Sequence, residues 1–254
     1  MQRIVEPARL QRLLAREDSV PDLGHSPLPA LKVDLARLKH KLLVLPDDPG
    51  PAARSYRMLR AQLLRRIRGE NRRAIGIVSA VDGEGKTLTA VNLALSIAAD
   101  PNHSAVLLDL DLRRPSIAKL LELPIANGFE SWLDGRVAFE QLCYSLAGVE
   151  RLTIVPTVSP VAGSSEALAQ NRTQKLLAAM KLDTSDRILI IDLPPVLLTD
   201  DFLTIAPLLD GVLLVAREGV TKREDLERVA ELLGSTPLLG TVLNGSTESE
   251  RRAY

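Results

Sequence analysis

The sequence predicts an α/β fold: a doubly wound, mostly parallel sheet with helices on both faces. Two observations predict it. After residue 73, short segments are apolar at nearly every position, and segments with helical apolar spacing alternate with them. Strands that are apolar throughout are typical of a sheet covered on both faces, where ligands bind at the carboxyl ends of the strands. The expected strands are 74–80, 104–109, 151–156, 187–192, 211–216 and 238–243. The expected helices among them are 86–99, 164–182, 200–209 and 222–233.

The first part of the chain differs from the rest because proline interrupts it repeatedly. Two short amphipathic patches, 5–15 and 31–45, predict one or two helices there, and the prolines of 46–51 predict a loose linker. The expected organisation is an N-terminal extension and linker over 1–53, the main domain over 54–246 and a short C-terminal tail over 247–254.

A strongly basic helix is expected over 54–68, where apolar side chains recur at helical spacing. Between Arg54 and Arg73, eight arginines face one glutamate, Glu70, which gives a local charge of +7 (8 − 1). Two interpretations stay open. The arginines form a solvated helix face, or they form a docking surface for an acidic partner, a neighbouring subunit or anionic lipid.

The composition excludes several classes of function. The 32 basic and 32 acidic residues cancel and aromatic residues make up only 3%, which argues against a nucleic-acid-binding protein. The single cysteine, Cys143, cannot form an internal disulfide, and the three histidines have no zinc-site spacing, so the chain fits a reducing cytosol. The apolar runs are far shorter than the roughly 18 residues of a membrane span, so no transmembrane segment is expected.

The strongest motif is Ala80-Val-Asp-Gly-Glu-Gly-Lys-Thr87, a P-loop pattern with alanine in the first position, set between a strand and a helix. Gly83 and Gly85 let the backbone turn its N–H groups toward phosphate oxygens. Lys86 is expected to reach the β- and γ-phosphates, and the Thr87 hydroxyl to ligate Mg²⁺. The alternative is a plain glycine turn. The expected ATP-binding residues of this motif are Asp82, Gly83, Glu84, Gly85, Lys86, Thr87 and Leu88.

A pair of acidic residues, Asp109 and Asp111, follows the strand expected over 104–109. Their spacing places both carboxylates on one side of an extended chain. Two negative charges at such a short distance favour a bound cation or a role as a base. Arg113 and Arg114 supply positive charge nearby. The alternative is a surface strand end with salt bridges.

Three further polar positions follow expected strands. Asp192 ends an apolar strand and suits a carboxylate that holds Mg²⁺ through water; a helix-capping aspartate is the alternative. Asp200 and Asp201 fit helix capping better than metal binding. Asn244, at the end of the last strand, could give its amide to an adenine edge, but its spacing alone favours a turn asparagine.

The P-loop and the three segments that carry Asp109 and Asp111, Asp192, and Asn244 together resemble the bacterial tyrosine kinases of polysaccharide synthesis, the CpsD/CapB type. This family belongs to the MinD/ParA-like P-loop ATPases. The likeness covers about 54–246 and includes the family's acidic box, aspartate-x-aspartate-x-arginine. The family also has a Glu-x-x-Arg-x-x-Arg pattern used for ring assembly. Arg57 and Arg60 match it, but Arg54 stands where glutamate is expected, and Asp82 stands where the family P-loop usually has proline.

The resemblance implies an ATP- and Mg²⁺-dependent tyrosine kinase or ATPase that serves exopolysaccharide or capsule synthesis and export. It implies catalytic roles for Lys86, Asp109 and Asp111, with Asp111 accepting or orienting the tyrosine proton. Thr87, Asp109 and Asp192 would hold the metal, and the resemblance also supports Asn244 as an adenine contact. A homo-oligomer and a separate membrane chain-length regulator, the polysaccharide co-polymerase, are the implied partners. The expected location is the cytoplasm, with peripheral placement at the inner face of the cell membrane.

The tail departs from the family, whose kinases end in a cluster of tyrosines. Here it holds Tyr254 alone as candidate phosphoacceptor, and the other tyrosines are Tyr56 and Tyr144. This scarcity favours an alternative, a MinD/ParA-like ATPase switch without tyrosine kinase activity. Against that alternative, Val81 stands where many such switches have a second lysine. A third reading is an adaptor that binds nucleotide without turnover.

Overall fold

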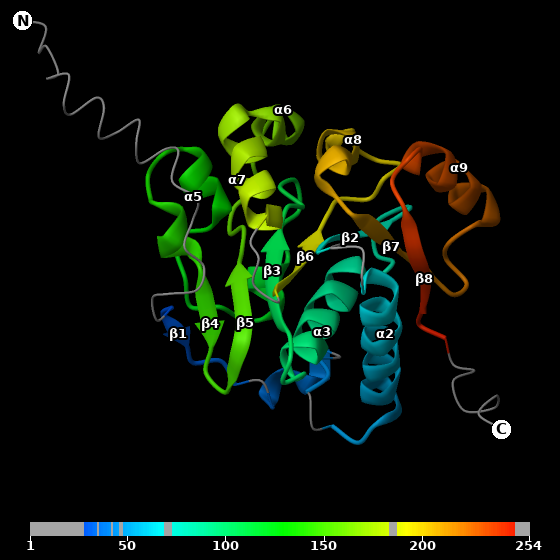
Figure 1. The fold of residues 1–254 in the computed structure, drawn as a ribbon, viewed down its shortest axis with the longest axis horizontal. Helices are drawn as coiled ribbons and strands as arrows, with labels where there is room; N and C mark the ends of the chain where they lie inside the picture. Colours follow the sequence, from blue (N-terminus) through cyan, green and yellow to red (C-terminus); the bar gives the residue numbers. More distant parts are fainter. Residues whose placement is uncertain are drawn as a thin grey trace, which may run out of the picture.

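An eight-stranded sheet in the order β1-β4-β5-β3-β6-β2-β7-β8 organises the chain (Figure 1). The computed structural model describes residues 28–34, 36–41, 43–45, 48–68, 73–182 and 187–246. The strands are β1 Ala30–Leu31, β2 Ala74–Ser79, β3 Ser104–Asp109, β4 Tyr144–Leu146, β5 Val149–Val155, β6 Arg187–Asp192, β7 Gly211–Arg217 and β8 Leu238–Asn244. Neighbouring strands are parallel except β4 and β5. The predicted doubly wound, mostly parallel sheet is therefore confirmed.

Helices cover both faces of this sheet. The α-helices are α2 Pro51–Ile67, α3 Lys86–Ala98, α4 Ile117–Leu120, α5 Phe129–Leu133, α6 Ser164–Ala169, α7 Asn171–Leu182, α8 Asp201–Ile205 and α9 Arg223–Leu233. The described residues also form the short 3₁₀ helices η1 Arg37–Lys41, η2 Phe139–Leu142 and η3 Ala206–Leu208. No helix among the described residues has the length and apolar character that a membrane span requires.

The strands divide the core into two clusters because alternate side chains point to opposite faces. In β2, Ile75 and Ile77 join the cluster beneath α2 and α3, whereas Val78 joins the cluster beneath α5, α7, α8 and α9. Helix α3 is buried at every position from Thr89 to Ala98, which explains why it is apolar on nearly all sides. This packing fixes the start of α3 directly after β2, and that junction is the P-loop.

The helix expected over 31–45 is wrong. In the described part of that segment, Leu31 belongs to strand β1, which pairs with β4, and only the short η1 is helical. The η1 turn begins where the Asp34 carboxylate accepts the Arg37 N–H at 2.9 Å. Leu38 and Leu43 are buried against the α3 face, so this segment packs on the sheet. The helix expected over 5–15 lies outside the described residues.

Two other expected helices are broken. The helix expected over 164–182 divides into α6 and α7 at Gln170, whose backbone is extended with ψ 138°. The helix expected over 200–209 ends as an α-helix at Ile205 and continues as η3, which has Pro207 in its first turn. Proline lacks the N–H that an α-helical hydrogen bond needs, and this explains the change of helix type.

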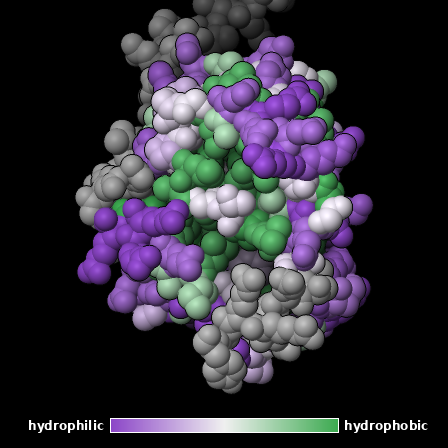
Figure 2. Space-filling view, turned by 90° about the vertical axis from the view of Figure 1, so that its right-hand side faces the viewer, coloured by the Kyte–Doolittle hydropathy of each residue, from purple (hydrophilic) through white to green (hydrophobic). Residues whose placement is uncertain are grey.

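The sheet ends at β8, whose outer edge is not paired with another described strand. Figure 2 shows apolar side chains gathered on the face that carries β8 and α9, between hydrophilic regions. Leu238 and Leu243 of β8 are among the exposed apolar residues of the chain. The guanidinium of Arg66, from α2, donates to the Leu239 carbonyl, so one of the outward carbonyls of this edge is already bonded.

Candidate functional site

The P-loop joins β2 to α3 through two glycines in left-handed conformation. Gly83 has φ +79° and Gly85 has φ +91°, values that side-chain-bearing residues rarely adopt. Gly85 is the N-cap of α3, and its carbonyl accepts the Thr89 N–H at 2.9 Å as the first helical bond. The positive end of the α3 dipole therefore faces the loop, as an anion site requires.

Lys86 lies between two carboxylates at the carboxyl ends of β3 and β6. Its Nζ is 2.6 Å from Asp111 Oδ2 and 3.7 Å from Asp192 Oδ1, and only 8% of the residue is exposed. Asp109 and Asp192 are direct partners in the pairing of β3 with β6. The structure thus brings the P-loop lysine and the predicted acidic residues together at one edge of the sheet.

Thr87 completes a set of oxygen atoms beside the lysine. Its hydroxyl donates to Asp192 Oδ2 at 2.6 Å, while Asp192 Oδ1 is buried with no hydrogen-bond partner in the described part of the chain. A carboxylate and a hydroxyl fit Mg²⁺, which prefers oxygen ligands and takes others from phosphate and water. Among the described residues, no three or more acidic, histidine or cysteine side chains form a group that could hold a metal ion.

Asp109 has a different setting from the other two acidic residues. It is fully buried, and its Oδ2 accepts the backbone N–H groups of Ser116 and Ile117 at 3.1 and 3.0 Å, at the start of α4. Its Oδ1 accepts the Asp111 N–H at 3.2 Å. This geometry favours a positioning role for Asp109, which fixes the turn carrying Asp111, over the expected role as a metal ligand.

Burial is the largest influence on the ionisation of this site. It raises the pKa of Asp109 well above its usual range, and the charge of Asp192 adds to that effect. Burial also raises the pKa of Asp192, although Lys86 and the Thr87 hydroxyl oppose it. For Lys86, burial acts to lower the pKa, but Asp192 and Asp111 outweigh it and raise the pKa. The lysine therefore stays charged, and additional positive charge would be favoured.

Contacts from β7, β8 and the loop after β7 brace the P-loop. The buried Glu84 accepts the Val81 N–H at 2.9 Å and a hydrogen bond from the Thr221 hydroxyl. Asn244 Nδ2 donates to the Glu84 carbonyl, and Arg217 Nη1 donates to the Gly83 carbonyl, both at 2.9 Å. Asn244 is thus at the site, but its amide bonds the loop itself, and its adenine contact stays a prediction.

The sequence did not single out Arg217 and Thr221. Their only signal is position, because β7 pairs with β2 and its carboxyl end must lie beside the P-loop. Of the remaining predicted residues, Leu88 is half-buried against the α3 core cluster, and Tyr254 lies outside the described residues.

Arg113 connects the acidic box to the start of α8. Its guanidinium lies 3.2 Å from Asp200 and 3.4 Å from the buried Asp201, and it donates to the Ser164 hydroxyl at 2.9 Å. The expected capping role of Asp200 is wrong, because the residue stands at the N-cap of α8 without a side-chain capping bond. Its carboxylate pairs with Arg113 instead.

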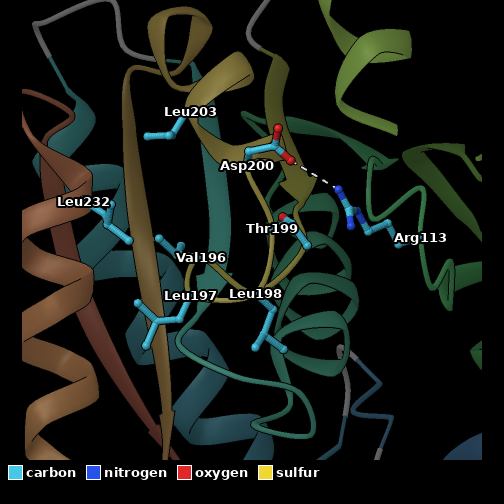
Figure 3. Close-up of a pocket in the computed structure, with 8 residues that line it drawn as sticks. All are labelled: Arg113, Val196, Leu197, Leu198, Thr199, Asp200, Leu203 and Leu232. Atoms are coloured by element: carbon cyan, nitrogen blue, oxygen red, sulfur yellow. Dashed lines mark hydrogen bonds and ion pairs between the residues drawn. The ribbon is translucent and has the colours of Figure 1, made fainter. Parts of the chain in front are cut away.

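A cavity of about 410 Å³ lies next to this ion pair (Figure 3). Figure 3 shows Arg113 and Asp200 facing each other on one side and the aliphatic residues on the other. The lining consists of Arg113, Val196, Leu197, Leu198, Thr199, Asp200, Leu203 and Leu232. Most of these residues belong to the segment that follows Asp192, so the cavity adjoins the strand end that carries the site.

Comparisons with known proteins agree with this geometry. A family model described as ParA, NUBPL iron-transfer P-loop NTPase, matches residues 70–249. The chain is 28% identical over 221 residues to the tyrosine-protein kinase YwqD of Bacillus subtilis, covering 86% of this chain and 92% of YwqD. It is 32% identical over 185 residues to the tyrosine-protein kinase CpsD of Streptococcus agalactiae, covering 71% and 78%.

The chain is also similar to a longer protein and to a kinase domain of solved structure. The succinoglycan biosynthesis transport protein ExoP of Rhizobium meliloti is 27% identical over 220 residues, which are 80% of this chain but 26% of ExoP. The solved kinase domain of the Escherichia coli tyrosine kinase ETK superimposes with a TM-score of 0.71 at 25% identity, covering 82% of this chain and 80% of that domain.

Proposed function

The chain belongs to the ParA-type P-loop NTPases and, within them, to the bacterial tyrosine kinases of the CpsD and YwqD type. From this membership we propose that it is an ATP- and Mg²⁺-dependent protein-tyrosine kinase that regulates exopolysaccharide or capsule synthesis and export. The observation that carries the proposal is the placement of Lys86 Nζ 2.6 Å from Asp111, beside the bonded pair Thr87 and Asp192. A phosphate-binding lysine, a candidate base and a metal-binding pair thus meet at the carboxyl ends of the central strands.

The P-loop residues bind and orient the triphosphate in this proposal. The loop backbone at Gly83 and Gly85 and the start of α3 cradle the phosphates. Thr87 and Asp192 hold Mg²⁺, which supplies charge neutralisation for the outer phosphates when it is bound. Lys86 turns from Asp111 toward the β- and γ-phosphates, whose negative charge competes with that of Asp111 for the ammonium.

Asp111 accepts the proton of the attacking tyrosine. The exchange of Lys86 toward phosphate releases Asp111 Oδ2 at a point next to the phosphate that reacts. The tyrosine oxygen then forms a bond to the γ-phosphorus, the bond to the ADP oxygen breaks, and the phenolic proton passes to Asp111. Asp109 keeps Asp111 in place through its bond to the Asp111 N–H.

The partners follow from the same family membership. We propose a homo-oligomer in which Tyr254 of one copy is the phosphoacceptor of another. A separate membrane chain-length regulator would recruit the protein to the cytoplasmic face of the membrane. The likeness to ExoP, a succinoglycan biosynthesis transport protein, supports the link to polysaccharide export.

A second candidate function is an ATPase switch without tyrosine kinase activity. The observation that favours it is the scarcity of tyrosine, with Tyr254 as the only tyrosine of the tail. In that case the same P-loop residues bind and hydrolyse ATP, and the nucleotide state controls partner docking.

Incubation of the purified protein with ATP labelled at the γ-phosphate tests these functions. The kinase predicts label on tyrosine that is lost in Tyr254→Phe, and Asp111→Asn should lower the transfer rate by roughly 10²–10⁴-fold with nucleotide binding retained. Asp134→Asn, at an exposed ion pair on the α5 side, is the matched control. Free phosphate without labelled tyrosine would favour the switch, and a wild-type transfer rate in Asp111→Asn would refute the assigned base.

A further inference from the structure

Arg114 links the acidic box to the P-loop on the outside of the site. Its N–H donates to Asp111 Oδ1 at 3.0 Å, and its carbonyl accepts the Ser116 hydroxyl at 2.8 Å, so its backbone is fixed. Its side chain is 73% exposed and its guanidinium pairs with Asp82, whose side chain is 42% exposed. An immobile backbone and an exposed side chain allow the guanidinium to change partners without disturbing the fold.

The other cations around the loop are committed to different contacts. Lys86 is buried against Asp111 and Asp192, Arg113 pairs with Asp200 and Asp201, and Arg217 bonds the Gly83 carbonyl. Arg114 differs from them because its described ion-pair partner is a carboxylate of the phosphate-binding loop itself. That carboxylate carries the same sign of charge as phosphate.

Asp82 stands in an unfavourable place for an acidic residue. It lies in the P-loop next to Gly83, and its side chain is 42% exposed. A carboxylate at the rim of a phosphate site repels phosphate, and the repulsion is removed only while a cation neutralises it. A guanidinium also binds phosphate oxygens as well as it binds carboxylate, through the same planar donors.

We propose that Arg114 is a phosphate-binding residue and that Asp82 holds it in the absence of nucleotide. The Asp82 carboxylate takes the place of a phosphate group on the guanidinium, and nucleotide binding transfers Arg114 from Asp82 to an outer phosphate. This inference rests on the proposed nucleotide-binding function and adds to it a residue outside the P-loop motif. It also gives the aspartate at position 82 a function, because that residue competes with nucleotide for Arg114.

A double-mutant cycle separates this proposal from simple charge neutralisation. The variants are Arg114→Gln, Asp82→Asn and the double variant, with Arg114→Lys to keep the charge without the planar donors. The probe is fluorescent ADP, and a non-hydrolysable ATP analogue serves as competitor, with Mg²⁺ at fixed salt. Arg136→Gln is the matched control, because Arg136 forms a similarly exposed ion pair with Asp134, the residue that ends α5. Thermal unfolding without nucleotide checks that each variant is folded.

The proposal expects Arg114→Gln to weaken binding about tenfold, which corresponds to about 1.4 kcal/mol, and Arg114→Lys to weaken it less. Asp82→Asn should tighten binding, and Arg114→Gln should weaken binding at least as much in the Asp82→Asn background as in the wild type. If Arg114 only neutralises Asp82, the double variant will bind like Asp82→Asn, and that result overturns the proposal. A wild-type protein that binds neither nucleotide would instead overturn the nucleotide-binding function as a whole.

Discussion

Gly85 is the position where the P-loop touches the last strand, and its replacement by alanine tests how the two are packed. The residue has φ +91°, a conformation that costs a side-chain-bearing residue about 1–2 kcal/mol. A Cβ at this position would lie 2.0 Å from Asn244 Nδ2, so the amide would have to move. The bond from Asn244 to the Glu84 carbonyl would then be lost, which costs about 1 kcal/mol more.

Gly85→Ala should therefore lower the free energy of unfolding by about 2–3 kcal/mol in total. Gly83→Ala is the matched control. Gly83 also has a positive φ, +79°, but a Cβ there would meet no heavy atom within 4 Å. We expect Gly83→Ala to cost only the conformational part, about 1–2 kcal/mol.

Urea unfolding followed by circular dichroism, without nucleotide, measures both variants. The double variant Gly85→Ala with Asn244→Ala adds a second check, because the clash disappears when the amide is absent. Its destabilisation should be smaller than the sum of the two single effects by about 1 kcal/mol. Equal destabilisation by the two glycine substitutions, together with additive effects in the double variant, would refute the reasoning.

Three further predictions concern other parts of the fold. Arg60→Ala should destabilise the protein by about 1 kcal/mol, because Arg60 donates to a carbonyl of α3 at 2.6 Å, whereas Arg65→Ala on the exposed face should change stability by less than about 0.5 kcal/mol. Parallel denaturant titrations check this, and equal effects would contradict it. Burial raises the pKa of Cys143 to about 12, so about one thiol in ten thousand is ionised at pH 8; a thiol reagent should label it only in denaturant, not in the native state. Asp201→Asn should cost about 2 kcal/mol in thermal unfolding, because this carboxylate is buried with a hydroxyl and a guanidinium as partners, and an unchanged melting temperature would argue against that network.

The sheet could be predicted from the sequence because its strands are apolar throughout. The segments 104–109 and 187–192 have the same bounds in the structure as in the prediction. The segment between Ile117 and Leu146 was not predicted, because its helices and its strand β4 are too short to show a period. The same limit applies at 31–45, where the structure has only the end of the two-residue strand β1 and the short helix η1.

At the site, the motifs identified the residues but not all of their contacts. The placement of Lys86, Asp111 and Asp192 together follows from the rule that parallel strands present their carboxyl ends at one edge. The engagement of Asp109 with the α4 amides could not be foreseen, since it depends on a turn that is not periodic. For the basic helix, the sequence indicated a solvated face or a docking surface. It did not indicate that Arg60 and Arg66 donate hydrogen bonds to backbone carbonyls of other elements.

The bond between Asn244 and the Glu84 carbonyl joins residues 160 positions apart. Contacts between residues so far apart in the sequence slow folding, because the long intervening chain must first be closed into a loop. Any partly folded species that lacks β8 would have a P-loop without this support, and nucleotide could not stabilise that species as it stabilises the native state. Nucleotide would then act late on the folding pathway, because it would stabilise only those molecules in which β8 is already packed against the P-loop.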